Sequence, residues 1–381
     1  MRKINKRGGI GRVVYELARN HSKENEVHLL TSEYENPTEG VVVHNYHLPN
    51  RPFWLQIWFN LQRTASFLRS HGHEFDLIVS HDAESYTCDI LHKHSVYKKV
   101  LNKYMGERGL IYSIYKILDP RTRIVLKAEE RVVNNAKHII AISHKVKEEL
   151  MEWYDIPEEK ISVVYNGVNI NEFNPEFKEY FRYKVRKKHR MFMKDRVILF
   201  AGYEWERKGL ESLIKALGKI PHKKTKILVV GSGDEEKYKQ IARDSGVVKR
   251  VVFAGPVKNI QRYYAAADLF VFPVDYEPFG LVITEAMSSG LPVFTTKHAG
   301  AAELIEHGCN GFILKDTKPA TIAKQVKPVL ENNQLMRLIG VNARITAEKY
   351  SWKKQAYRCE EIYLANLDPE LALGFRSFGV Q

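Results

Sequence analysis

Apolar and polar positions follow one another along this chain in blocks that predict strands alternating with helices. Short apolar runs of strand type lie in the segments 27–31, 41–44, 75–80, 138–142, 197–202, 226–234 and 251–259. Longer stretches with helical spacing lie between several of them, as over 53–70 and 97–131. Strands that alternate with helices form parallel sheets with crossover connections. The pattern therefore predicts an α/β fold.

The segment 268–303 joins an apolar strand, a loop and a helix. The strand ends at Pro273, and an apolar helix is expected to open at Phe279. Glu277 stands in the loop, and Glu285 follows eight positions later, inside the helix. A carboxylate accepts hydrogen bonds from neighbouring hydroxyls, and the N–H groups of a helix N-terminus attract anions or sugar hydroxyls. The segment therefore predicts a site for a ribose or a hexose.

A second loop places two cations in front of a helix. The strand at 197–202 is followed by Y-E-W-E-R-K-G-L, so Arg207 and Lys208 precede the next helix directly. A guanidinium binds phosphate oxygens through a planar fork, and an ammonium binds them as a compact charge. Positive charge at this place would stabilise a departing diphosphate.

Two glycine-rich loops add to this picture. Residues 5–20 have the pattern of a loop with Gly8 and Gly9 followed by an amphipathic helix, and K-I-L-V-V-G-S-G-D places Gly231 after a strand. Glycine lets the backbone approach a ligand closely. Taken alone, each loop is either a phosphate-binding loop or a plain turn.

Together these motifs resemble the retaining, nucleotide-sugar-dependent glycosyltransferases of family four, which have the GT-B fold. E-P-F-G-L-V-I-T-E-A-M-S-S-G-L-P-V is similar to the signature in which the first Glu meets the donor sugar and the second the ribose. The resemblance implies two Rossmann-like domains that face each other across a cleft. It implies these donor-binding residues: Gly8, Gly9, Gly202, Arg207, Lys208, Gly231, Val257, Glu277, Pro278, Phe279, Gly280, Leu281 and Glu285.

The resemblance also sets the expected domain boundaries. It implies an N-terminal, acceptor-side domain over 1–168, a C-terminal, nucleotide-sugar-binding domain over 169–350, and a segment 351–381 whose helix crosses back to the first domain before a loose tail at 368–381. The family has a β-strand before the Gly-Gly loop, where only Met1 to Asn5 stand in this sequence. The first strand is therefore expected to be missing or shortened, which leaves the activity of the chain open.

Polar side chains follow a strand end in the first domain. His81 comes directly after the run at 75–80, and His94 lies in H-K-H-S-V-Y. The surrounding segment is similar to a stretch in lipopolysaccharide-core glucosyltransferases of the family, where an Asp takes the place of His94. Each His is either a base or hydrogen-bond partner for the acceptor hydroxyl or a structural residue. His94, His81, Glu277, Arg207 and Lys208 are the catalytic candidates.

The charge of the chain favours anionic partners. Its formal net charge is +14, with 44% hydrophobic and 27% charged residues, as in a globular protein. No helix-turn-helix, zinc-finger or RNP motif is present, so nucleic acid is not an expected partner. The segment 97–131 interleaves Lys and Arg with Tyr, which suits an anionic membrane surface or, equally, a solvated helix face.

The sequence shows no pattern typical of a disulfide framework or a metal site. Three separated cysteines, Cys88, Cys309 and Cys359, show no ligand spacing, and no cluster of Asp-x-Asp type is evident. The expected reaction needs no cofactor and no metal. The N-terminus lacks the apolar run of a signal peptide, so we expect a cytoplasmic protein. Peripheral association with the inner membrane face stays open, as one of the two interpretations of the segment 97–131.

The expected activity is transfer of a hexosyl group from a nucleotide diphosphate sugar to a hydroxyl of a glycan or lipid-linked acceptor, with retention. Same-face attack assisted by the leaving phosphate is preferred over a covalent intermediate on Glu277. Two alternatives remain open. One is a nucleotide-sugar epimerase or phosphorylase of the same fold, and the other is a noncatalytic module that binds nucleotide sugar or lipid.

Overall fold

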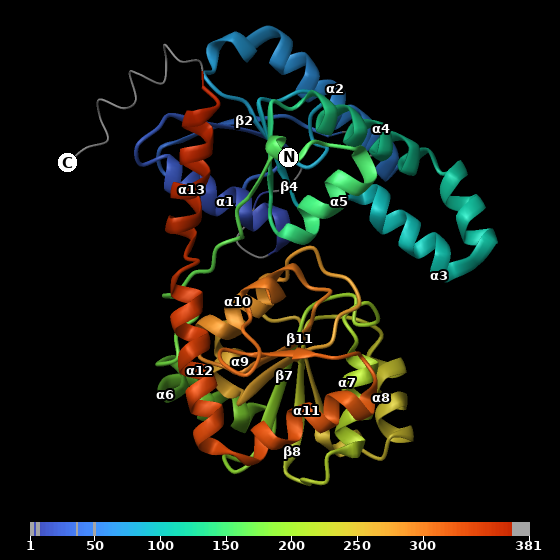
Figure 1. Cartoon of the computed structure of the whole chain (residues 1–381), viewed down its shortest axis with the longest axis vertical. Helices are drawn as coiled ribbons and strands as arrows, with labels where there is room; N and C mark the ends of the chain where they lie inside the picture. The colour runs from blue at the N-terminus through green and yellow to red at the C-terminus, as the bar shows by residue number, and fades with distance from the viewer. Residues whose placement is uncertain (1–3, 5–7, 36, 49–50, 368–381) are drawn as a thin grey trace. The chain divides into compact units, whose positions relative to one another are not determined.

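The chain consists of two compact units. A computed structural model describes residue 4 and residues 8–35, 37–48 and 51–367. Unit 1 comprises residues 1–166 with 352–381, and unit 2 comprises residues 167–351 (Figure 1). The boundaries predicted from the sequence were after residue 168 and after residue 350, within two residues of those in the structure. The tail expected over 368–381 lies outside the described residues.

Unit 1 is an α/β unit. Its elements are α1 (Gly9–His21), β1 (Val27–Thr31), β2 (Val41–Asn45), α2 (Phe53–His71), η1 (Gly72–Glu74), β3 (Val79–His81), β4 (Ile90–Lys93), α3 (Tyr97–Leu118), α4 (Pro120–Asn135), β5 (His138–Ala141), α5 (His144–Tyr154), η2 (Glu158–Lys160), β6 (Ile161–Val163) and α13 (Trp352–Ala365).

The strands of unit 1 pair in parallel, in two groups. The larger sheet has the order β3-β4-β5-β6, and β1 pairs with β2 separately. The described N-terminal residue Ile4 forms one parallel bridge with Tyr34 and is 1% exposed. The residues around it, 1–3 and 5–7, lie outside the described part, so the prediction about a first strand is tested only at this position.

Two details of unit 1 differ from the expected elements. Strand β4 was missed, because its sequence I-L-H-K alternates too little to stand out, and the helical stretch over 97–131 is two helices. The break falls at Asp119, whose side chain accepts a hydrogen bond from the N–H of Arg121, with Pro120 at the first helical position. Proline is favoured there, because its missing N–H would have no partner in the helix.

Helix α13 belongs to unit 1, against α1. The amide of Asn25 donates to Glu360 over 3.1 Å, and Tyr363 contacts His92 on β4 over 2.6 Å. The final helix therefore packs on the first part of the chain, after the chain has passed through unit 2.

Unit 2 is also α/β. Its elements are α6 (Phe177–Lys188), β7 (Arg196–Ala201), α7 (Leu210–Lys219), β8 (Thr225–Val230), α8 (Glu235–Asp244), η3 (Val248–Arg250), β9 (Val251–Gly255), α9 (Gln261–Ala266), β10 (Leu269–Phe272), α10 (Leu281–Ser288), β11 (Val293–Thr296), η4 (Gly300–Leu304), β12 (Phe312–Leu314), α11 (Pro319–Glu331) and α12 (Asn333–Glu348).

The six strands of unit 2 form one parallel sheet in the order β12-β11-β10-β7-β8-β9. β7, the first strand of unit 2 in the sequence, lies in the middle of the sheet. β8 and β9 follow on one side of it, and β10, β11 and β12 follow on the other side. Helices cover both faces of this sheet, and the strands β7, β8, β10 and β11 are almost entirely buried (Figure 1). This is a doubly wound sheet, and the α/β prediction is confirmed.

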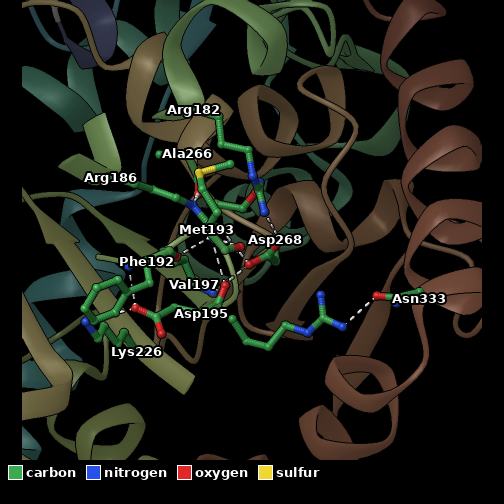
Figure 2. A network of polar contacts seen from close by, with 12 residues as sticks. Arg182, Arg186, Phe192, Met193, Asp195, Val197, Lys226, Ala266, Asp268 and Asn333 are labelled. Atoms are coloured by element: carbon green, nitrogen blue, oxygen red, sulfur yellow. Dashed lines mark hydrogen bonds and ion pairs between the residues drawn. The ribbon is translucent and has the colours of Figure 1, made fainter. Parts of the chain in front are cut away.

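A buried ion network fixes α6 to the start of this sheet (Figure 2). The guanidinium of Arg186, 0% exposed, contacts Asp268 at 2.9 Å and donates to the carbonyl groups of Ala266, Phe192, Met193 and Asp195. Arg182 reaches the other carboxylate oxygen of Asp268 at 2.5 Å. Burial alone would raise the pKa of Asp268, but the two guanidinium groups lower it overall. These two arginines of α6 therefore have a structural role.

We expect Arg186→Ala to lower the free energy of unfolding by about 3–5 kcal/mol, because it leaves the buried carboxylate of Asp268 without one of its cations. Chemical denaturation of the full chain measures this. Lys184→Ala, at an exposed position of the same helix, is the matched control and should change the value by less than about 0.5 kcal/mol. Equal losses for both variants would contradict the structural role of the network.

Candidate active site

The strand order of unit 2 defines where a ligand can enter. Neighbouring strands β7 and β10 continue into connections that lead to opposite sides of the sheet, so their C-terminal loops diverge. In doubly wound sheets a ligand binds at this switch point. The loop after β7 carries Arg207 and Lys208, and the loop after β10 carries Glu277. The structure thus brings the two sequence motifs to one place.

An ion pair joins the two loops. Arg207 Nη1 lies 3.2 Å from Glu277 Oε2, and the same nitrogen donates to the carbonyl oxygen of Tyr276 over 2.5 Å. The remaining nitrogens of Arg207 contact Glu204 at 2.9 and 3.3 Å. Both Arg207 and Glu277 are less than one-fifth exposed. The guanidinium is therefore held in place from three sides before any ligand binds.

Two glycines allow the loops to pack this closely. A Cβ on Gly202 would lie 2.6 Å from Lys208 Nζ, so the lysine side chain crosses over the bare α-carbon. A Cβ on Gly231 would lie 1.9 Å from the carbonyl oxygen of Gly202, which no side chain permits. Both residues also have positive φ, 141° and 123°. The predicted glycines are thus needed for the site to form, whatever they contact in a ligand.

Lys208 is the cation with the least compensation in this site. Burial lowers the pKa of Lys208. Glu277 and Glu285 oppose this effect, and Arg207 reinforces it. Its ammonium lies 5.6 Å from the ring centroid of Phe272, and the described residues provide no carboxylate within ion-pair distance of it. A nearby anion would favour its charged form. The site therefore suits an anionic group.

The loop that carries Glu277 is fixed to a second loop. The N–H of Glu277 donates to the carbonyl of His298 over 3.0 Å, and the N–H of Gly300 donates to the carbonyl of Glu277 over 3.0 Å. The N–H of Ala301 donates to Phe279 over 2.8 Å. These backbone bonds form a short parallel bridge, which gives Glu277 a defined position although it lies outside any strand.

Helix α10 begins two residues later than expected. It starts at Leu281, with Gly280 as its N-cap in the left-handed region at φ 97°. Phe279 is 2% exposed and belongs to the loop, where its carbonyl is already bonded. The expected helix start at Phe279 is therefore wrong. Phe279 is apolar like the helix, so the hydrophobic pattern assigned it to the helix. The left-handed backbone of Gly280 separates Phe279 from the first helical residue.

Glu285 lies in α10 and is 6% exposed. The hydroxyl of Tyr264, on α9, donates to Glu285 Oε2 over 2.9 Å and lies 3.2 Å from the carbonyl of Val282. Tyr264 was not predicted as a site residue, because nothing in the sequence distinguishes a tyrosine that only packs from one whose hydroxyl donates a hydrogen bond. This hydrogen bond orients a carboxylate that would otherwise be costly to bury.

Three predicted positions do not take part in these contacts. Val257 follows β9, the edge strand two positions away from β7, and is half-buried. Gly8 and Gly9 lie in unit 1, where Gly9 is the first residue of α1 and both are exposed. A Cβ on either glycine would meet nothing within 4 Å among the described atoms. The backbone at the start of α1 is therefore open to a ligand.

The predicted histidines contact each other. His81, at the end of β3, and His94, after β4, have Nδ1 and Nε2 2.9 Å apart, and His92 stacks on His81 with ring centroids at 4.7 Å. Burial lowers the pKa of His94 to about 3 and that of His81 well below its usual value. Both rings are therefore neutral at pH 7, and the pair shares one N–H···N hydrogen bond.

The described residues contain neither a metal-binding cluster nor a membrane-spanning helix. No group of three or more His, Cys, Asp and Glu side chains there is arranged to hold a metal ion. None of the helices that the structure describes is long and apolar enough to span a bilayer.

Known families match both units. A family model for glycosyl transferases group 1 matches residues 181–346, and one for Glycosyltransferase Family 4 matches residues 7–172. Among solved structures, WaaG, a glycosyltransferase involved in lipopolysaccharide biosynthesis, has a TM-score of 0.78 at 20% identity and covers 95% of this chain and 98% of its own. The Anabaena protein HepE in complex with UDP-glucose has a TM-score of 0.69 at 21% identity, with 94% and 98% covered.

Proteins similar to this chain in sequence are also glycosyltransferases. A D-inositol 3-phosphate glycosyltransferase from Corynebacterium efficiens is 25% identical over 318 residues, 78% of this chain and 73% of the relative. An uncharacterised glycosyltransferase, MJ1607, from Methanocaldococcus jannaschii is 30% identical over 343 residues, 87% of this chain and 86% of the relative. The identity and its coverage, together with the matches to both units, establish that this chain belongs to the family four glycosyltransferases and has their GT-B fold.

Proposed function

We propose that this glycosyltransferase moves a hexosyl group from a nucleotide diphosphate sugar to a hydroxyl of a glycan or lipid-linked acceptor, with retention at the anomeric carbon. The observation that carries the proposal is the cluster of Arg207, Lys208 and Glu277 at the switch point of the unit 2 sheet. A buried cation without full compensation suits a diphosphate, and a fixed carboxylate suits sugar hydroxyls.

In this proposal each charged side chain has one role. Lys208 and Arg207 bind the diphosphate and stabilise its charge as the glycosidic bond breaks. Glu277 accepts hydrogen bonds from hexose hydroxyls, and Glu285, oriented by Tyr264, accepts them from the ribose diol. The cations perform the charge neutralisation that a metal ion provides in other transferases, so the proposed reaction needs neither metal nor cofactor.

The sugar is transferred by attack of the acceptor hydroxyl on the face that the diphosphate leaves. The departing phosphate oxygen takes the hydroxyl proton, so no covalent adduct on Glu277 is required. Neutral His94 and His81 serve as hydrogen-bond partners rather than as charged acids. The named relatives are glycosyltransferases, which favours transfer over epimerisation, phosphorolysis or simple binding.

The α3 helix supports a second part of the proposal, association with an anionic membrane surface. After a kink at Gly109 (φ 81°) its last turns have the sequence L-I-Y-S-I-Y-K-I-L, and Leu110 and Ile111 are 75% and 87% exposed. Ile114, Tyr115, Ile117 and Leu118 are exposed as well. Several large apolar side chains are thus exposed on consecutive turns of one helix, as at sites of contact with a partner protein or a membrane.

The charges around these residues identify the kind of partner. Arg108, Arg121 and Arg123 are exposed beside the apolar turns, and Lys116 lies within them. A cationic rim around an apolar surface fits a bilayer with anionic headgroups, where each cation contributes about 1 kcal/mol. This part of α3 would bring the enzyme to a lipid-linked acceptor at the inner face of a membrane.

Donor binding is tested first with nucleotides. We expect one of UDP, GDP and ADP to raise the melting temperature of the full chain. Lys208→Met, which retains the aliphatic stem, should raise the Kd of that diphosphate by about 10–100-fold and leave the Kd of the corresponding nucleoside nearly unchanged. Calorimetry measures both. Because burial lowers the pKa of Lys208, wild-type affinity should also fall as the pH rises through that lowered pKa.

Lys215→Met is the matched control, since Lys215 is exposed on α7 and pairs with Glu211. The same loss in both variants, or an equal loss for nucleoside and nucleotide, would show that Lys208 does not bind the phosphates. No stabilisation by any of the three nucleotides would refute the proposed donor class.

Membrane association is tested by sedimentation with phosphatidylcholine vesicles that contain or lack phosphatidylglycerol. We expect binding only to the anionic vesicles, weakened by salt. Ile111→Glu should reduce binding by about tenfold or more, because inserting an isoleucine side chain contributes about 1.5–3 kcal/mol. Leu338→Glu, at a 59% exposed position of α12, is the control and should have no effect. If Ile111→Glu instead converts an oligomer to a monomer, α3 contacts a second copy and the membrane proposal fails.

A further inference from the structure

Helix α6 and the loop that joins it to β7 expose cations and aromatic side chains together on unit 2. From Tyr180 to Lys194 the sequence contains seven Lys and Arg residues and no Asp or Glu. Two of the seven, Arg182 and Arg186, are bound to Asp268. The other five are exposed and form no ion pair with any described residue: Lys184, Lys187, Lys188, Arg190 and Lys194.

Large apolar and aromatic side chains lie between these cations. Tyr180 and Tyr183 on α6 are 63% and 58% exposed, and Phe192 and Met193 in the loop are 66% and 52% exposed. The ammonium of Lys187 lies over the ring of Tyr183, 5.8 Å from its centroid. Groups of exposed large apolar residues mark sites of contact with a partner. We call these four residues, together with the five exposed cations, the α6 patch.

The loop that carries Phe192 and Met193 is fixed from its buried side. Arg186 donates to the carbonyl oxygens of both residues over 3.1 Å, and the N–H of Phe192 donates to Asp195 Oδ2 over 2.8 Å (Figure 2). Lys226, on β8, pairs with the same carboxylate at 3.0 Å. These bonds hold the backbone of the loop, so the two apolar side chains are exposed by an ordered segment.

The α6 patch lies at the edge of the unit 2 sheet where β7 and β8 begin. Its loop ends directly before β7, where the N–H of Arg196 donates to the carbonyl oxygen of Lys224 over 3.0 Å. Lys223 and Lys224 are exposed at this edge and add two cations. The candidate active site follows the C-terminal ends of β7 and β10, so the patch belongs to the opposite edge of the sheet.

The chemistry of the patch indicates the kind of partner. Four of its five cations are lysines, which are depleted in protein–protein interfaces. A lysine is a point charge on a flexible stem and needs no fixed partner geometry, which suits the mobile headgroups of anionic lipids. Aromatic and other apolar side chains beside such cations enter the boundary between headgroups and acyl chains.

We propose that the α6 patch binds the surface of a membrane that contains anionic phospholipids, with Phe192 and Met193 inserted among the headgroups. The inference extends the membrane association proposed through α3, because it names a second surface on the other unit. It depends on different residues and on neither the donor nor the acceptor.

The test uses the full chain with Ile111→Glu, which weakens any contribution of α3, and vesicles of phosphatidylcholine with or without phosphatidylglycerol. We expect this protein to retain measurable sedimentation with the anionic vesicles only. Adding Phe192→Ser should reduce the remaining binding by about tenfold, because the inserted ring is lost. Adding Lys187→Glu and Lys188→Glu together should reduce it by about tenfold or more, because four units of charge are changed.

Insertion of the loop has a separate readout. With Phe192→Trp in the same background, acyl chains brominated near the headgroup should quench more of the tryptophan emission than they quench in the parent protein. Unchanged quenching, together with unchanged sedimentation of the Phe192→Ser protein, would show that the loop does not enter the membrane and would overturn the inference.

Two controls match these variants at exposed positions of unit 2: Leu338→Ser on α12, and Lys324→Glu with Lys327→Glu on α11. Both should leave vesicle binding unchanged, and losses equal to those of the patch variants would contradict the proposal. So would a patch that instead binds a single-stranded oligonucleotide or a second copy of the chain. If Phe192→Ser reduces vesicle binding and Ile111→Glu alone does not, the α3 proposal fails, and the opposite result removes only the α6 patch.

Discussion

The reversal of strand order between β7 and β10 is the constraint on which unit 2 depends. Because β7 lies in the middle of the sheet, the loops that follow β7 and β10 lead to opposite sides. At the end of β7 the backbone of neighbouring loops comes so close that glycine is required. Gly231 meets the carbonyl of Gly202, and Gly202 provides the surface that Lys208 crosses. The ion pair between Arg207 and Glu277 then joins the diverging loops. Topology creates the opening, and these few residues determine its shape and charge.

This arrangement explains why charged residues of the site can be partly buried without a ligand. Glu277 is held by backbone bonds to the loop at 298–300, Arg207 by two carboxylates and a carbonyl, and Glu285 by Tyr264. Lys208, by contrast, has no ion-pair partner among the described residues, and more distant charges act on its pKa. A site that holds most of its charges in place before binding needs little reorganisation when a charged substrate enters.

Much of this site could be predicted from the sequence, because its signals are local. The glutamates eight positions apart, the R-K pair and the glycines after strands each lie within one strand–loop–helix segment. Signals that depend on distant residues were missed. Tyr264 reaches Glu285 from another helix, and Lys93 meets Glu129, which is 36 positions away in the sequence. The start of α10 was misplaced for a different reason, since the φ angle of Gly280 is not visible in a hydrophobic pattern.

The ion pairs of the described residues also show why net charge is a poor guide to the local field at a site. The chain has a formal net charge of +14, which by itself would favour phosphate-bearing ligands at any site on the protein. Yet many of its cations are already paired: Arg182 and Arg186 neutralise one buried carboxylate, and Lys93 is shared by two. Within a Debye length it is the unpaired charges that a ligand meets. At Lys208, which has no carboxylate within ion-pair distance among the described residues, a ligand meets positive charge.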